Sequence, residues 1–506
     1  MNKRKRFYFN GILMSAVGVA LRTVALAFGA YISHKVGAEG VGLNTLIMSV
    51  YGFALTFATS GINLTVTRLV ARHIGEGSET DIGRTLRGAT AYAIGFSLVA
   101  TLVLAGLSGF FATVCIGDVR AVMPLQILSL SLIPSALVGV ISGYFVARRR
   151  IIRNSVIGIA AQAFRIVVTV LILLSSATEG VEAAVRGLCI GISLSELVTF
   201  LLALILFMVE RRGAGKNRSG TDIAPVFEMA LPLAASAYIR SGLLSVEHNL
   251  IPKRLEERGV PMSEALSSFG EMHGMALPMV TYPMAPLSSF AGLLLPEFAE
   301  SEARGDKERM SRIASEAISK TLSYAILSAV ILFLFSEDLG YIIYGSYRAG
   351  SFIAMLAPIV PIMYIDHVVD SMLKGIGEQV YSMWVNIIDS ALSVLLVFIL
   401  IPILGIEGYA VVIIVMELFN FLLSYIRLRK RIRLSVGYPR VIFVSLVSAA
   451  LASLLVERLF ADTLHLVPFA LFLKIVFAVC AHFAVQIPLF HLLGRVVGKR
   501  GKTVLK

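Results

Sequence analysis

Two arginines each stand alone near the middle of a long apolar segment. Arg22 lies within residues 11–32, and Arg240 lies within residues 224–251. A guanidinium group in membrane hydrocarbon costs at least ~2.5–3.5 kcal/mol and stays protonated at physiological pH, so it is retained where it faces protein, water or an anion. The pair predicts a central cavity that binds a negatively charged molecule. The alternative for either residue is an arginine that snorkels or pairs with a carboxylate of another helix.

Two carboxylates of another apolar segment predict a second kind of chemistry. Asp366 and Asp370 stand one helical turn apart, on one face of a helix. Two interpretations stay open: a site for a cation or proton that couples transport, and a solvated carboxylate pair near the cytoplasmic mouth. No cluster of His and Cys with metal-ligand spacing accompanies them, so we predict neither a metal site nor a cofactor.

Further polar residues stand near the outer ends of apolar segments. They are Glu247 and His248, and then Glu271 and His273. In one interpretation they line the outer mouth of a substrate-binding cavity, where a histidine titrates in a useful pH range. In the other they face lipid headgroups at the membrane interface.

The elements that must position these residues are membrane-spanning helices. Of the 506 residues, 57% are hydrophobic and 15% are charged, and the mean hydropathy is +0.83. Apolar runs of ~20 residues recur along the chain, and each can cross a ~30 Å hydrocarbon core as a helix. We predict an all-α membrane protein with about 14 transmembrane helices. The predicted spans are 10–33, 42–67, 88–110, 121–147, 154–176, 183–209, 224–251, 268–299, 313–336, 350–373, 380–402, 407–426, 439–457 and 467–493.

The distribution of basic residues predicts the orientation of these spans. With the N-terminus inside, 32 of the 45 Lys and Arg fall in cytoplasmic segments and 7 fall in outer loops. Because positive charge is retained on the cytoplasmic side, both termini are predicted to be cytoplasmic. The net charge of +13 lies in short loops, so it does not indicate binding of nucleic acid.

An internal repeat relates the two halves of the chain. Pro134 and Pro361 stand 227 residues apart in corresponding spans, and Glu196-Leu197 matches Glu417-Leu418. An even number of helices in each repeat makes the halves parallel. We therefore predict two parallel-related six-helix bundles followed by two C-terminal helices and a basic tail. The predicted domains are 1–220, 221–433 and 434–506.

The two bundles differ at one pair of polar positions. Arg165 and Glu196 fall in the fifth and sixth spans, and we predict that they form a structural ion pair within the first bundle. Asp389 and Glu417 are the matching residues of the second bundle, without an obvious cation. In the eighth span, Pro278, Pro283 and Pro286 predict a kinked or unwound middle.

Several stretches of sequence carry a family resemblance. They include residues 36–42, 48–53 and 282–297. These stretches resemble the multidrug/oligosaccharidyl-lipid/polysaccharide exporter superfamily and its stage V sporulation protein B branch. Residues 15–22 are similar to the first-helix motif of lipid II flippases, in which the resemblance assigns Arg22 to the substrate diphosphate. Ala16 stands where that motif has a second arginine.

The resemblance implies a flippase rather than an enzyme. Its substrate would be a lipid-linked oligosaccharide, an undecaprenyl-diphosphate peptidoglycan precursor. A multi-pass protein of the bacterial cell membrane would move this substrate across the membrane by alternating access during cell-wall or spore-cortex synthesis. Membrane lipids and a coupling cation or proton are the other expected partners. Two alternatives stay open: a cation-coupled multidrug exporter of the same fold, and a non-transporting membrane scaffold for wall assembly.

Overall fold

The computed structural model is helical, and no strand occurs among the residues it describes. The described residues are 3–176, 180–211, 220, 223–459, 471, 473–486 and 488–489. The chain forms two compact units. Unit 1 comprises Met1–His34, Glu271–Ser393 and Ile406–Lys506, and unit 2 comprises Lys35–Gly270 and Val394–Gly405.

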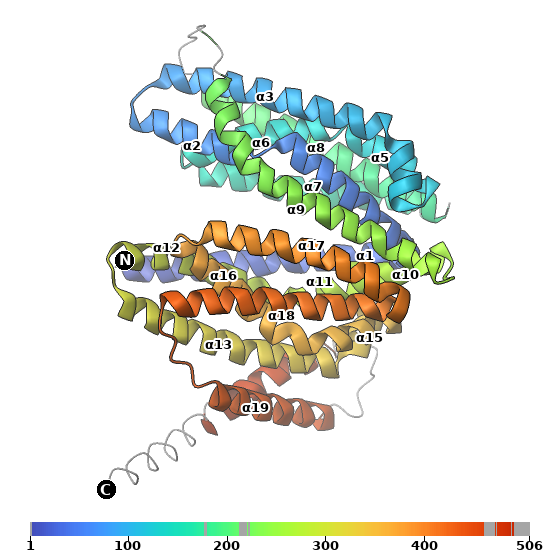
Figure 1. The fold of residues 1–506 in the computed structure, drawn as a ribbon, viewed down its shortest axis with the longest axis vertical. Coiled ribbons are helices and arrows are strands. Elements are labelled where there is room, and N and C mark those ends of the chain that lie inside the picture. The colour runs from blue at the N-terminus through green and yellow to red at the C-terminus, as the bar shows by residue number, and fades with distance from the viewer. Residues whose placement is uncertain are drawn as a thin grey trace. The chain divides into compact units, whose positions relative to one another are not determined.

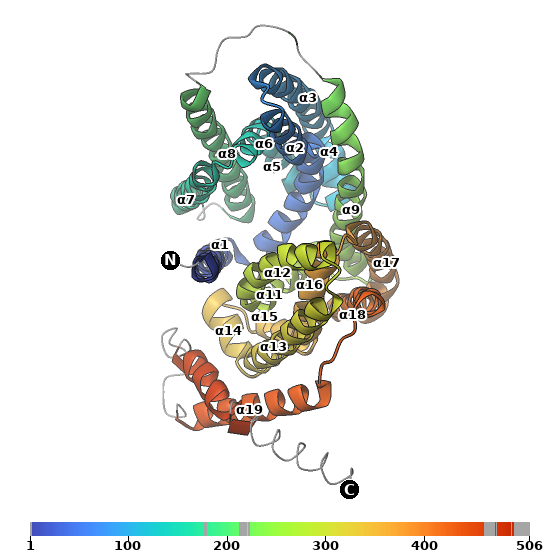
Figure 2. The same cartoon turned by 90° about the vertical axis from the view of Figure 1, so that its left-hand side faces the viewer.

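Unit 2 contains the second half of α1 and the helices up to α10 (Figures 1 and 2). Its elements are α1 (Lys3–Thr59, from Lys35 on), α2 (Ile62–Gly75), α3 (Glu79–Gly106), α4 (Ser108–Phe110), η1 (Phe111–Ile116), η2 (Val119–Ala121), α5 (Val122–Ser129), α6 (Leu132–Ala147), α7 (Ile151–Ser176), α8 (Val181–Arg211), α9 (Ala224–Glu257) and α10 (Met262–Phe269). Val66, Ala89 and Phe145 are fully buried in a core between α2, α3 and α6. Leu102 and Leu171, in contrast, are 64% and 62% exposed, which is the pattern of helices that face lipid.

The start of unit 2 depends on two glycines of α1. Gly37 has φ 76° and ψ 171°, a conformation that glycine adopts readily, and it breaks the helix between the first two predicted spans. Gly42 then lies against the backbone of Leu266 in α10, where no Cβ would fit. The predicted second span, 42–67, is also interrupted, because Ser60 and Gly61 adopt positive φ and separate α1 from α2.

Unit 1 contains the first part of α1 and the helices from η4 to α19, with the exception of the last residues of α17 (Figures 1 and 2). Its further elements are η4 (Gly270–Ala276), α11 (Leu277–Thr281), η5 (Tyr282–Met284), α12 (Ala285–Ala303), α13 (Lys307–Leu334), α14 (Ser336–Tyr344), α15 (Tyr347–Leu356), η6 (Ala357–Ile359), α16 (Val360–Gly375), α17 (Gln379–Leu404), α18 (Ile406–Arg431) and α19 (Tyr438–Leu459). Phe298, Ile318 and Val368 are fully buried in a core that α12, α13 and α16 build.

The predicted break in the eighth span is confirmed. The segment from α10 to α12 passes through a π-helical turn, η4, and a 3₁₀ turn, η5, which contains Pro283. A proline frees carbonyl groups that must find other donors within a membrane. The hydroxyl of Tyr364 donates to the carbonyl of Val280 at 2.8 Å, and that of Tyr324 donates to the carbonyl of Pro283 at 2.7 Å.

The structure confirms an all-helical membrane fold. Among the described residues, nine helices are long and apolar enough to cross a membrane, or eleven if each bent pair is one span. One bent pair is α5 and α6, which meet at 41° two residues before Pro134 of α6. The total of 14 spans stays a prediction, because the loop 212–219 and much of residues 460–506, including the basic tail, lie outside the described residues.

The units do not follow the order of the sequence repeat. Unit 1, which holds most of the second half, takes the first helix up to His34, and unit 2 takes α9 from the second half. The predicted domains 1–220, 221–433 and 434–506 rest on the sequence repeat, and they stay a prediction.

Candidate functional site

Arg22 lies on the part of α1 that belongs to unit 1, next to the broken eighth span. Its side chain is partly exposed, and its charge acts on Tyr364 and His367 of α16. The following residue, Thr23, forms a 2.8 Å hydrogen bond with the hydroxyl of Tyr282 in η5. The α1 helix therefore holds Arg22 beside the unwound turn and its tyrosines.

Arg240 lies on α9 of unit 2, and its side chain is exposed. Its neighbours in the helix hold α9 against the end of α1: Tyr238 hydrogen-bonds to Ser60, which directly follows α1, and Ser241 accepts a 3.2 Å hydrogen bond from Thr56 of α1. Neither Arg240 nor Arg22 forms a hydrogen bond or an ion pair with a residue that the structure describes. The described carboxylates thus leave both guanidinium groups available for an anion.

Glu247 and His248 lie one turn or more beyond Arg240 on α9, and both are buried in unit 2, with exposed fractions of 8% and 6%. The ring of His248 packs against Phe269 with a centroid distance of 5.8 Å. Asn249 donates hydrogen bonds to the carbonyl of Ser245 at 2.6 Å and to the hydroxyl of Ser49 at 3.2 Å. These side chains therefore face the interior of the unit rather than lipid headgroups.

Glu271 and His273 lie on η4 and bind other residues of unit 1. Ser346, the N-cap of α15, donates a 2.6 Å hydrogen bond to Glu271, whose second oxygen lies 3.6 Å from Arg348. His273 Nδ1 lies 3.2 Å from the hydroxyl of Tyr409 on α18. Both residues thus join the π-helical turn to neighbouring helices.

The two predicted coupling carboxylates have different surroundings. Asp370 forms a 2.5 Å ion pair with Lys374, one turn further along α16. The Oδ1 atom of Asp366 is buried without a hydrogen-bond partner among the described residues. Asp366 therefore carries the less compensated charge of the two.

The charges that act on Asp366 come from Asp370 and Lys374 of the same helix and from acidic residues of two further helices. The charges of Asp366, Asp389 on α17 and Glu417 on α18 act on one another. No described Lys or Arg forms an ion pair with Asp366 or Glu417. We refer to Asp366, Asp389 and Glu417 as the acid cluster. Within the described part of the chain, no group of His, Cys, Asp or Glu is arranged to hold a metal ion.

The predicted ion pair of the first bundle is confirmed. Arg165 on α7 donates a 2.8 Å hydrogen bond to Glu196 on α8. The hydroxyl of Ser135 on α6 donates to the other oxygen of Glu196 at 3.0 Å. Each charge of the pair is therefore matched within the unit.

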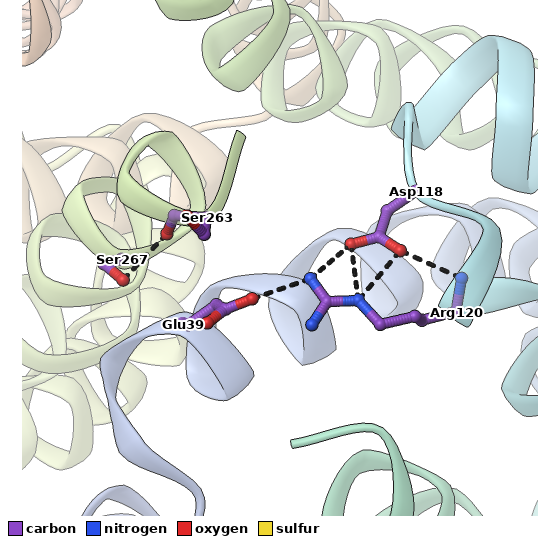
Figure 3. Close-up of polar contacts among 5 residues, drawn as sticks. All are labelled: Glu39, Asp118, Arg120, Ser263 and Ser267. Atoms are coloured by element: carbon purple, nitrogen blue, oxygen red, sulfur yellow. Dashed lines mark hydrogen bonds and ion pairs between the residues drawn. The ribbon is translucent and has the colours of Figure 1, made fainter. Parts of the chain in front are cut away.

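A second ion-pair cluster of unit 2 could not be recognised from the sequence (Figure 3). Arg120 donates to both carboxylate oxygens of Asp118, at 2.6 to 3.0 Å, and to Glu39 at 2.7 Å. Glu39 follows the break at Gly37, so this contact ties the kinked part of α1 to η2. Glu39 and Arg120 are 81 residues apart in the sequence, so no local sequence pattern could predict their contact.

Glu378 forms a third cluster, at the turn between α16 and α17. Arg427 donates to both of its oxygens at 2.9 and 3.0 Å, and Arg431 donates to one at 2.6 Å. Burial works against the charge of Glu378, but the hydrogen bonds from the two arginines outweigh it and lower the pKa of Glu378 below its usual value.

Unit 2 also contains an apolar cavity of about 710 Å³. Phe53 on α1, Phe111 on η1 and Leu243 on α9 line it, together with Ile239 and Gly242, which flank Arg240. Such a cavity can accept an apolar molecule or an apolar part of one.

The sequence comparison decides the family. The profile described as polysaccharide biosynthesis protein matches residues 8–290, more than half of the chain. The chain belongs to the polysaccharide biosynthesis protein family. This family member is similar to stage V sporulation protein B of Bacillus subtilis, with 23% identity over 421 residues, 81% of each protein. It is also similar to sporulation protein YkvU of the same organism, with 19% identity over 70% of this chain and 79% of that protein.

Solved structures with the same fold are membrane transporters. The lipid II flippase MurJ, in an inward closed conformation, matches with a TM-score of 0.71 and 14% identity over 94% of this chain and 99% of that chain. An inward-facing multidrug resistance MATE family transporter of the MOP superfamily matches with a TM-score of 0.63 and 15% identity over 81% of this chain and 95% of that chain. This polysaccharide biosynthesis protein is therefore a multi-pass membrane protein with the MOP fold.

Proposed function

We propose that this protein is a flippase for a lipid-linked oligosaccharide, and that its substrate is an undecaprenyl-diphosphate peptidoglycan precursor. The proposal depends on one observation: Arg22 and Arg240 lie within apolar helices, and neither forms an ion pair with a described carboxylate. The planar guanidinium group binds phosphate oxygens through two parallel hydrogen bonds. The fold shared with a lipid II flippase and the similarity to sporulation proteins support the same substrate class.

Transport is proposed to proceed by alternating access and to be coupled through the acid cluster. Several carboxylates in a region of low dielectric repel one another, so they retain their positions best when a proton or a monovalent cation reduces the charge. Asp366 is the proposed coupling residue. Asp370, which is paired with Lys374, is proposed to hold the end of α16 near the cytoplasmic face. Glu247, His248, Glu271 and His273 are proposed to position the helices next to the substrate.

A topology experiment tests the proposed orientation. Single cysteines are placed in the predicted cytoplasmic loop 211–218 and in the predicted outer loop 255–261, and intact cells are labelled with a membrane-impermeant maleimide. We expect labelling of the second cysteine but not of the first, because the first loop carries the excess of positive charge. Labelling of both from outside would contradict the proposed fourteen-span arrangement with cytoplasmic termini.

Reconstitution tests the proposed function directly. The purified protein is inserted into liposomes that contain fluorescent lipid II or a simpler polyprenyl-diphosphate sugar. Exposure of the headgroup on each side is then measured with an impermeant quencher. We expect faster exchange of lipid II than in protein-free liposomes and in liposomes with the Arg22→Ala protein. Equal exchange in all three would refute the flippase proposal.

A cation-coupled drug exporter is the second candidate function. Two observations favour it: the shared fold of a multidrug transporter and the largely apolar cavity of about 710 Å³ in unit 2. An exporter of this kind would bind hydrophobic cations, which the two unpaired arginines repel. Tight binding of a cationic dye that survives Arg22→Ala and Arg240→Ala, without binding of a lipid diphosphate, would favour the exporter.

A further inference from the structure

Unit 1 contains a basic cavity of about 970 Å³ that is separate from Arg22 and the acid cluster. Its walls are the first turns of α13, the last turn of α18 and the segment 432–435 that leads toward α19. These helix ends lie at the same end of unit 1 (Figure 1). Six basic residues line the cavity: Lys307, Arg312, Arg429, Lys430, Arg431 and Arg433.

The segment after α18 is fixed against α13 by hydrogen bonds and by apolar packing. The hydroxyl of Ser311 donates to the carbonyl of Arg433, and the backbone N–H of Ser435 donates to the hydroxyl of Ser315 at 2.9 Å. Leu434 packs against the hydrophobic core of the unit. The cavity is therefore a built feature with a defined wall, rather than a gap beside a free loop.

The positive charge inside this cavity is compensated only in part by the protein. Arg431 binds Glu378, but no described carboxylate forms an ion pair with Lys307, Arg312 or Lys430. Glu308 is the one acid among the lining residues. An anion in the cavity would reduce the mutual repulsion of these cations.

Membrane orientation accounts for basic residues at this end of the unit, but it does not require six of them to line one cavity. Basic residues are expected in cytoplasmic segments, and those at the end of α18 also complement the negative end of its helix dipole. Lys307 and Arg312, in contrast, lie in the first two turns of α13. A helix N-terminus carries partial positive charge, so the dipole of α13 does not favour basic residues there. Asp306 already caps this helix terminus, where it accepts a 2.9 Å hydrogen bond from the backbone N–H of Arg309. A bound phosphate would therefore be stabilised by the surrounding basic side chains.

We propose that the basic cavity binds the phosphate of an anionic phospholipid headgroup. Two spans, α13 and α18, begin or end at the cavity, α19 begins three residues after its last lining residue, and Ile432 contributes an apolar surface to its wall. A phospholipid can therefore place its headgroup in the cavity while its chains stay along the helices. Basic pockets between transmembrane helices are suited to such headgroups. The bound lipid would join the segment between α18 and α19 to the adjacent leaflet.

The test compares two sets of substitutions that remove equal charge. The cavity variant carries Arg312→Gln, Lys430→Gln and Arg433→Gln. The control variant carries Arg68→Gln, Arg72→Gln and Arg84→Gln, which lie in unit 2 and outside the cavity. The proteins are purified in a neutral detergent, checked for equal thermal stability and titrated with dioctanoyl phosphatidylglycerol, dioctanoyl phosphatidylcholine or inorganic pyrophosphate in a calorimeter.

We expect phosphatidylglycerol to bind the wild type and the control variant alike. Its affinity for the cavity variant should fall about tenfold or more, because three cations near the phosphate are lost. Phosphatidylcholine should bind far more weakly to all three proteins. Equal affinity of phosphatidylglycerol for the wild type and the cavity variant would overturn the proposal. Pyrophosphate that binds as tightly as phosphatidylglycerol, with the same loss in the cavity variant, would assign the cavity to a soluble phosphate compound and overturn the lipid assignment.

Discussion

Unit 2 places a cation next to its intramembrane carboxylate, whereas unit 1 places further acids there. The corresponding residues of the repeat are Glu196 and Glu417. Glu196 binds Arg165 and Ser135, and its charge is matched by hydrogen bonds. The charges of Asp366 and Asp389 act on Glu417, which forms no ion pair with a described Lys or Arg.

The difference indicates that the corresponding carboxylates of the repeat serve different purposes, one in stabilising the fold and the other in binding a proton or cation. A matched ion pair in a membrane interior stabilises one arrangement of helices and has little reason to exchange protons. An acid cluster has an energetic reason to bind a proton or a cation, and this is the property that coupling requires. We therefore assign a structural role to the pair of unit 2 and propose a coupling role for the cluster of unit 1.

The largest loss of transport is expected at Arg22 and Arg240, which pair with no described carboxylate. Arg22→Ala and Arg240→Ala should each lower lipid II exchange in liposomes about a hundredfold, because each removes a charged contact to the proposed diphosphate. Protein yield and thermal stability should stay close to those of the wild type. Arg22→Lys and Arg240→Lys should restore part of the activity, since an ammonium group lacks the planar fork. Full activity of both alanine variants would exclude the arginines from the substrate site.

The second largest effect is expected on the stability of the protein when the ion pair between Arg165 and Glu196 is broken. Glu196→Leu should destabilise the protein by about 3 kcal/mol or more, because it leaves Arg165 charged and unmatched inside the membrane. The measurement is thermal unfolding in detergent. A double variant, Arg165→Met with Glu196→Leu, is the control and should recover most of the loss. If the double variant folds well but does not transport, the pair takes part in the transport cycle.

A substitution in the acid cluster should change the coupling of transport without destabilising the protein, in contrast to the substitution at Glu196. Asp366→Asn should leave the thermal stability unchanged or raise it, because it removes one of several repelling charges. Transport should lose its dependence on an imposed proton or cation gradient, measured in the same liposomes. Asp370→Asn on the same helix is the matched control, and it should keep the gradient dependence. Normal gradient dependence of the Asp366→Asn protein would return this residue to a structural role.

The smallest effect is expected at Glu378, where the arginine partners are partly exposed. Since its pKa is lowered in the folded protein, its contribution is present above the usual pKa of glutamic acid and is lost as the pH falls below it. Glu378→Gln should therefore cost at most about 1 kcal/mol at pH 7 and less at pH 4. Melting temperatures of the two proteins should converge on acidification. A gap that widens toward pH 4 would contradict this role.

Local patterns predicted a large part of the fold and one part of the site. The apolar runs predicted the helices, and the prolines of the eighth span predicted the turn at Pro283. The pairing of Arg165 with Glu196 could be predicted because the two residues lie on consecutive helices, which must pack side by side.

Other features depend on contacts that no local pattern reveals. The partners of Glu39 and Glu271 stand far away in the sequence, and so do the two walls of the basic cavity. The grouping of residues 3–34 with the second half also depends on packing between distant segments. A repeat identifies equivalent helices, but it does not specify which of them pack in one unit.

The composition of the units has a consequence for biosynthesis. Unit 2 is nearly contiguous, since Lys35–Gly270 provides all of it except Val394–Gly405. Its helices can therefore associate while the ribosome is still translating the second half. The first helix, with Arg22, has to remain in the bilayer until α11 to α18 have been inserted, because its partners belong to that later segment. We expect this helix to be the last of the N-terminal half to reach its native packing, and thus the part most dependent on insertion factors.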